Sequence, residues 1–137
     1  PGATNAFLGG PVIWFRPTAA GSFGLEAAVT DADSGPASAE FPAVATAGWV
    51  HSAETVTSGS GAPPTVSYPS STYSWSAGAS APGTHTVTAR DVAGNTTAAA
   101  LTISADATGP AGALTVNATA ATTSTSVSYS STGTWTA

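Results

Sequence analysis

The sequence predicts an all-β fold, an antiparallel β-sandwich, and three observations lead to that prediction. About seven short segments alternate apolar and polar residues with a period of two, as strands with one buried face do. Clusters of Gly, Pro, Asp and Asn separate these segments at the spacing typical of sandwich strands and turns. No window of the sequence has the apolar period of an amphipathic helix.

The composition supports one folded domain of low charge. The 137 residues fit one sandwich of about 100 residues and a remainder. Charged residues make up 7% of the chain, against roughly 25% in ordinary globular proteins, so hydroxyl groups must keep the surface soluble. The apolar fraction of 42% is enough for a core and argues against disorder.

The charge balance excludes several classes of partner. The formal net charge is −5, and Arg16 and Arg90 are the only fixed cations, so no basic surface for nucleic acid can form. No apolar run approaches the roughly 20 residues that cross a bilayer, which predicts no membrane insertion. The chain has no Cys, which excludes disulfides and thiolate ligands. No signal-like stretch surrounds Pro1, so we expect an excerpt of a longer secreted polypeptide.

Two strands and a turn are predicted at the start of the chain. Residues 5–17 form a short extended segment, and the prolines that bracket its second half favour an edge strand. Residues 22–29 alternate apolar with small or polar side chains and are predicted as one continuous, inward-facing strand. Residues 30–36, which contain two Asp, a Gly and a Pro, then reverse the chain.

The middle of the chain alternates short strands with connections. Residues 37–44 are predicted as a strand, and Trp49 begins a short continuation that caps the core. Residues 55–64 have no periodicity and are predicted as a surface loop. Strands resume at residues 65–68 and 72–76, and in the second of these Tyr73 and Trp75 share a face.

A β-hairpin and a joint follow. Residues 84–90 alternate outward Thr with inward side chains, among them His85. Residues 91–95 suit a turn with a left-handed position at Gly94, and a second arm alternates inward Ala99, Leu101 and Ile103 before it ends. The next residues are small, include Gly and Pro, and are predicted to tether another unit.

This hairpin and joint, HTVTARDVAGNTT…LTISADATGP, resemble the last two strands and the linker of bacterial immunoglobulin-like (Big-type) repeats in large secreted or cell-surface proteins. The family's D-x-A-G-N turn is matched at residues 91–95, and its D-x-T-x-P joint at residues 106–110. The resemblance implies an immunoglobulin-like β-sandwich at residues 1–106 and a linker at residues 107–112. Residues 113–137 would then be the first strands of a following repeat, or a strand donated to a neighbour.

The end of the chain resembles its beginning. Residues 127–136 match the pattern of residues 12–25, with a step of 115 positions from Val12 to Val127, and the joint places Pro110 where Pro1 stands in the first copy, a step of 109 positions. The chain is therefore expected to be a tandem-repeat fragment of about 1.2 units. We expect residues 113–137 to begin the next repeat, or else to complete a sandwich in a neighbouring copy by strand addition.

The resemblance implies a non-enzymatic structural or adhesive module of an extracellular stalk, adhesin or filament. Its partners would be neighbouring repeats or copies of itself. No nucleophile elbow presents any of the many serines, so no catalysis is expected. The alternative function is a carbohydrate-binding module that presents exposed Trp49 or Trp75 to surface glycans, although core packing is the ordinary use of such side chains.

Four aspartates are candidate ligands for Ca²⁺, a cation that takes six to eight oxygens. Asp31 and Asp33 lie in one turn, Asp91 begins the hairpin turn, and Asp106 lies at the joint. An immunoglobulin-like order would bring the two turns to the same end of the domain, where a neighbouring repeat could add a linker carboxylate. Asp106 would have that role at the second joint. The alternative is that Asp and Asn stabilise these turns without a metal.

Overall fold

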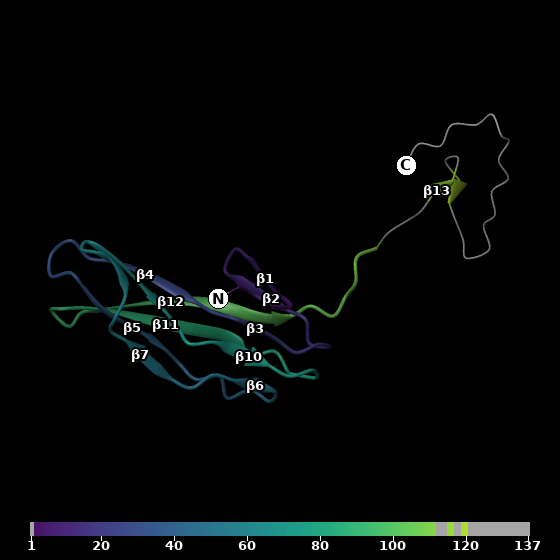
Figure 1. Cartoon of the computed structure of the whole chain (residues 1–137), viewed down its shortest axis with the longest axis horizontal. Coiled ribbons are helices and arrows are strands. Elements are labelled where there is room, and N and C mark those ends of the chain that lie inside the picture. Colours follow the sequence, from purple (N-terminus) through teal and green to yellow (C-terminus); the bar gives the residue numbers. More distant parts are fainter. Residues whose placement is uncertain (1, 112–114, 117–118, 121–137) are drawn as a thin grey trace. The chain divides into compact units, whose positions relative to one another are not determined.

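The computed structural model describes residues 2–111, 115–116 and 119–120. The chain divides into two units, Pro1–Ala107 and Thr108–Ala137. Twelve strands in three sheets build the first unit, and the described residues contain no helix, so the all-β prediction is confirmed (Figure 1). In particular, this part of the chain contains no helix long and apolar enough to cross a membrane.

The largest sheet has six strands in the order β1-β2-β12-β11-β5-β7. They are β1 (Ala6–Gly9), β2 (Val12–Phe15), β5 (Pro36–Phe41), β7 (Glu54–Val56), β11 (Gly83–Asp91) and β12 (Thr96–Ala105). Strands β11 and β12 form the predicted hairpin, and Gly94 in its turn has a φ of 96°, the left-handed conformation that glycine adopts without strain. Strand β2 pairs in parallel with residues 102–105 of β12, so among the described strands the rest of β12 pairs with β11 alone.

Two smaller sheets have three strands each. One has the order β3-β10-β6, with β3 (Gly21–Phe23), β10 (Tyr73–Trp75) and β6 (Trp49–Val50). The other has the order β4-β9-β8, with β4 (Glu26–Thr30), β9 (Thr65–Pro69) and β8 (Ser60–Ala62). The continuous strand predicted for residues 22–29 is therefore wrong, because β3 and β4 belong to different sheets. The inward alternation itself is right, since Phe23 and Val29 are buried.

Two further predictions are corrected. Residues 5–17 form a hairpin rather than one edge strand: β1 lies at the edge of the sheet, and β2 lies between β1 and β12. Residues 55–64 are not a loop, because β7 ends and β8 begins within them. All residues of β8 are exposed, so no buried face imposes an apolar period on its sequence.

The core consists of two clusters. The larger one joins side chains of the six-stranded sheet to aromatic side chains of the β3-β10-β6 sheet; its buried members are Ile13, Phe15, Phe23, Val44, Trp49, Tyr73, Trp75, Ala79 and Ile103. The smaller one joins Ala39 and Phe41 of β5 to Val29 of β4 and Tyr68 of β9. Leu25, at the break between β3 and β4, packs against both clusters. Trp49 is thus in the core, as predicted. Tyr73 and Trp75 share a face of β10, as predicted, and both are buried.

The described residues of the second unit are 108–111 and two short strands that pair antiparallel, β13 (Thr115–Val116) and β14 (Thr119–Ala120). Residues 113–137 are predicted to be either the first strands of a next repeat or a strand donated to a neighbour. Apart from β13 and β14, this segment lies outside the described residues.

Candidate functional site

The two acidic turns meet at one end of the first unit. The amide of Val92 donates to the carbonyl of Gly35 at 3.0 Å, and the amide of Ala93 donates to Ser34 Oγ at 3.3 Å. Sequence reasoning expected these turns at the same end, and these bonds join them directly.

The carboxylates of both turns accept hydrogen bonds from their own turn. Asp31 Oδ2 accepts from the amides of Ser34 at 2.8 Å and Gly35 at 2.5 Å. Asp91 accepts from the amide and the side-chain amide of Asn95, each at 2.7 Å. These bonds, the one from the Asn95 side chain first, hold the pKa of Asp91 below its usual value. Asp31 and Asp91 therefore stabilise turns, which is the metal-free alternative.

The other two candidate ligands are placed differently. Asp33 is exposed in the first turn, and its side chain makes no hydrogen bond to the described residues. Asp106 follows the far end of β12, where its amide donates to the carbonyl of Phe15 at 2.8 Å. Within the described residues, no group of three or more acidic or His side chains is placed to hold a metal ion. Calcium binding at a joint stays a prediction.

Millimolar Ca²⁺ is expected to leave the melting temperature of this chain unchanged, because Oδ2 of Asp31 and both carboxylate oxygens of Asp91 already accept hydrogen bonds within their turns. Differential scanning calorimetry with and without Ca²⁺ checks this. The joint site needs a polypeptide with two complete repeats as the comparison. A rise in melting temperature for that polypeptide alone supports a site between repeats, and a rise for this chain contradicts the turn-forming role.

The tryptophans proposed as a glycan platform are not exposed. Trp49 is 7% and Trp75 is 3% exposed, so the expectation that either one is presented to solvent is wrong. The Trp75 indole donates to the carbonyls of Ala19 at 2.9 Å and Arg16 at 3.1 Å, and the Trp49 indole donates to the carbonyl of Ser80 at 2.8 Å. Both rings are buried in the core, and these hydrogen bonds satisfy the polar N–H groups that are buried with them.

A different aromatic pair is exposed. Phe7 on β1 and Trp14 on β2 are cross-strand partners, and their side chains are 69% and 41% exposed. A Cβ at Gly9 would contact both rings, so the glycine leaves room for them. Sequence reasoning did not identify the pair, since the hairpin that brings Phe7 beside Trp14 was not predicted.

Two histidines and a tyrosine form a buried polar group. The ring of His51 stacks on Tyr73 with centroids 3.5 Å apart, and the hydroxyl of Tyr73 lies 2.9 Å from His85 Nε2. His51 Nε2 has no hydrogen-bond partner among the described residues and lies 3.9 Å from a carboxylate oxygen of Glu54. His85 is thus a buried, inward residue of β11, as predicted, and Tyr73 is its partner.

Burial sets the protonation of these groups. It lowers the pKa of His51, and the Thr72 backbone and the Glu54 carboxylate oppose this in part. Burial and then the neighbouring His51 lower the pKa of His85, and burial raises the pKa of Tyr73. All three side chains are thus neutral in the folded chain at pH 7.

The folded state is expected to lose stability as the pH falls through about 6.5, the pKa of a free His. Because both folded-state pKa values lie below that value, the unfolded chain binds more protons there, and unfolding becomes easier until the folded His residues also titrate. Melting temperatures from pH 8 to pH 5 measure the effect. The chain has two His residues, so the double variant His51→Gln/His85→Gln is the control. An equally steep loss in that variant contradicts the assignment.

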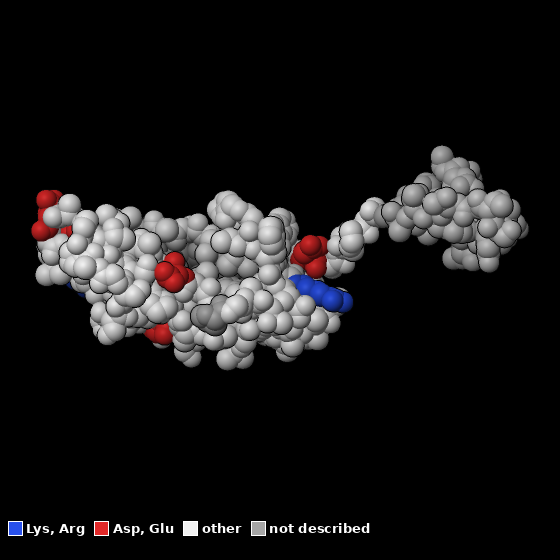
Figure 2. Space-filling model, turned by 45° about the horizontal axis from the view of Figure 1, so that its top comes forward, with Lys and Arg blue, Asp and Glu red and all other residues white. Residues whose placement is uncertain are grey.

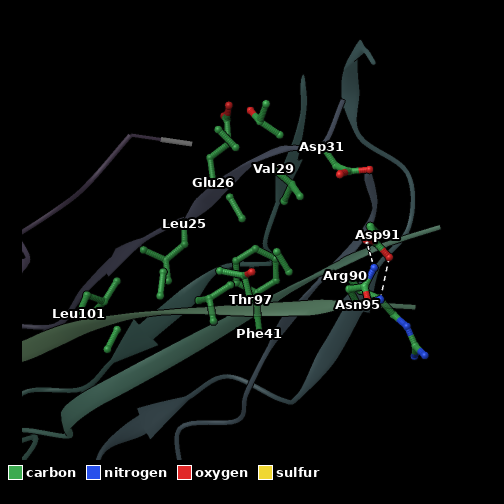
Figure 3. Close-up of a pocket in the computed structure, with 17 residues that line it drawn as sticks. Leu25, Glu26, Val29, Asp31, Phe41, Arg90, Asp91, Asn95, Thr97 and Leu101 are labelled. Atoms are coloured by element: carbon green, nitrogen blue, oxygen red, sulfur yellow. Dashed lines mark hydrogen bonds between the residues drawn. The ribbon is translucent and has the colours of Figure 1, made fainter. Parts of the chain in front are cut away.

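A groove opens beside the smaller core cluster. Its volume is about 470 Å³, and it is lined by β4 on one side and by Thr97 and residues 99–101 of β12 on the other (Figure 3). Phe41, Val87 and Ala89 also line it, so its inner surface is largely apolar. We refer to this cavity as the β4–β12 groove.

Charged side chains also line the β4–β12 groove. Asp31 and Asp91 with Arg90 lie toward one end of it, and Glu26 belongs to the β4 side (Figure 3). Sequence reasoning missed the groove. The one available signal was the run Thr96–Ala100, which contains no large apolar side chain; all of these residues are exposed.

The geometry offers two surfaces for contact with a partner, the exposed Phe7–Trp14 pair and the β4–β12 groove, and it places the histidines in the core. No protein-family model, curated protein or solved structure matches the chain.

Proposed function

We propose that the chain is a non-enzymatic structural module, an immunoglobulin-like β-sandwich repeated in series along an extracellular stalk, adhesin or filament. One observation carries the proposal. Strand β1 begins at Ala6, five positions after Pro1, and β13 begins at Thr115, five positions after Pro110. Both strands pair antiparallel with the next strand across two intervening residues. The first strands of the two units thus start 109 positions apart, and the pairs that close their first turns, Gly9–Val12 and Val116–Thr119, are 107 positions apart, a similar spacing that supports serial repeats.

Two other features describe how such a module would be held together and what surface it would present. Lys and Gln are absent, so the isopeptide and ester cross-links that some surface proteins use are not available, and neither are disulfides. The first unit instead holds together by its aromatic core and its strand pairing. Its surface is poor in charge: Figure 2 shows acidic and basic side chains scattered over an otherwise uncharged face.

The open reading frame that encodes the chain tests the proposal. We expect further copies of the D-x-T-x-P joint at intervals of about 109 residues, and a secretion signal at the start of the frame. A frame that encodes a single copy and no secretion signal contradicts the proposal.

A second candidate, carbohydrate binding, is favoured by the exposed Phe7–Trp14 pair, since sugar rings stack on exposed aromatic side chains. Trp14 then replaces the buried Trp49 and Trp75 as the binding residue. A glycan array probed with the wild-type chain and with Trp14→Ala tests this. Signals that disappear in the variant support carbohydrate binding, whereas signals that persist, or an array without signal, leave the structural role alone.

A further inference from the structure

The edges of two strands face the β4–β12 groove and have no strand partner among the described residues. Strand β4 is the outer strand of its sheet, and residues 96–101 of β12 have a neighbour on the β11 side only. Thr102 donates its amide to the Pro11 carbonyl, away from β11, so by strand alternation the backbone groups of Ala98 and Ala100 also point to the open side. Such an edge is a template for a further strand.

Strand β1 has the complementary properties. It is the outer strand of the six-stranded sheet, so its far edge has no strand partner in the described part of the chain. Leu8 is the cross-strand partner of the buried Ile13 and therefore lies on the core side of the sheet, as does Ala6, which packs against the core. Even so, Leu8 is 64% exposed. An apolar side chain on the core side of an edge strand gains free energy when another surface covers it.

We propose that β1 of one copy docks along residues 96–101 of β12 in a second copy and inserts Leu8 into the β4–β12 groove. The lengths agree, because the open stretch of β12 is longer than β1 and leaves the acceptor's own β2 in place beside residues 102–105. Leu8 would lie against Val87, Phe41 and Leu101, which line the groove. The inference rests on the proposed structural role and specifies how copies associate.

Charge favours the contact. Strands β1 and β2 contain no charged residue, and Arg16 follows β2 directly. The acidic side chains that line the groove, Glu26, Asp31 and Asp91, outnumber Arg90. The donor strand therefore brings no carboxylate to a net negative acceptor; Arg16 has Asp106 beside it, since the amide of Asp106 donates to the carbonyl of Phe15.

The donor strand and the acceptor groove are different surfaces of the same chain. Contact between them is head-to-tail, so each copy that docks leaves a free groove and a free β1 at the two ends of the assembly. Such a contact extends into a filament unless its rotation closes a ring.

Sedimentation equilibrium of the chain over a range of concentrations tests the inference. We expect the weight-average mass of the wild type to rise more than about twofold toward millimolar concentration, as a weak, open-ended contact implies. Leu8→Asp blocks the donor and Ala99→Trp fills the acceptor, so each variant alone should stay monomeric. Phe7→Ser and Ala98→Trp change exposed neighbours on the opposite faces of the same strands, add no charge and should associate like the wild type.

The mixture of the two blocked variants gives the sharpest result. Leu8→Asp keeps its groove and Ala99→Trp keeps its β1, so together they should form a dimer of one copy of each and nothing larger. Melting temperatures check that every variant folds, with Leu8→Ser as the substitute donor variant if Leu8→Asp does not.

A wild type that stays monomeric, or association that survives both blocking variants, overturns the docking, as does a mixture that forms no dimer. A weight-average mass that does not change with concentration would mean that a segment of the same chain fills the groove, and it overturns the docking as well. None of these results bears on the number of repeats in the reading frame, so the structural role is tested separately.

Discussion

Replacing Trp75 by Ala is expected to lower the free energy of unfolding by about 4 kcal/mol, the cost of removing a large aromatic side chain from a packed core. Trp75 is 3% exposed and packs against three aromatic rings, those of Phe15, Phe23 and Trp49, at centroid distances of 5.4, 6.1 and 5.0 Å. The variant also leaves the carbonyls of Ala19 and Arg16 without the indole donor. Urea denaturation followed by circular dichroism measures the loss.

Trp14→Ala is the matched control for that prediction. Its indole is 41% exposed at the surface of β2, so we expect a loss of less than about 1 kcal/mol. Equal losses in the two variants would show that the cluster around Trp75 is not the main source of stability.

The substitution Gly21→Ala is expected to cost about 3 kcal/mol, although it adds a single methyl group. A Cβ at Gly21 would overlap the six-membered ring of Trp75 and the backbone carbonyl of Thr4. Gly21 is the register partner of Trp75 in the pairing of β3 with β10, and Thr4 forms a bridge to the next residue, Ser22. The methyl group must therefore displace either the core indole or the segment that leads into β1.

Gly2→Ala serves as the control, because a Cβ at Gly2 meets no atom within 4 Å. Thermal unfolding of both variants measures the difference, for which we expect roughly 15 °C. A Gly21→Ala variant as stable as Gly2→Ala would contradict the close contact between β3 and Trp75.

The hairpin β11–β12 was predictable because its information is local. The alternation of its arms and the left-handed turn at Gly94 lie within one short stretch of sequence. The split between β3 and β4 was not predictable in this way. Leu25 continues the inward alternation through the break, so the pattern of apolar residues is the same for one strand as for two strands in different sheets.

The candidate surfaces depend on pairing between distant segments. The β4–β12 groove exists because β2 pairs with only residues 102–105 of β12. No residue pattern in either strand indicates where that pairing ends. Likewise, Phe7 meets Trp14 because the chain turns at Gly10, whose φ is 61°. The neighbouring Pro11 favours an edge strand in the sequence and does not indicate this turn. The aspartates were easier to interpret, since Asp31 and Asp91 bond within their own turns.

The role as a repeated surface module is tested most directly by the position of the chain on intact cells. An antibody raised against the first unit, applied to unpermeabilised cells of the organism that makes the protein and imaged by immunogold electron microscopy, reports that position. The account predicts gold particles outside the cell envelope, in rows along a stalk or filament, because each serial repeat carries the same epitope. Label that appears only after the cells are permeabilised would contradict it.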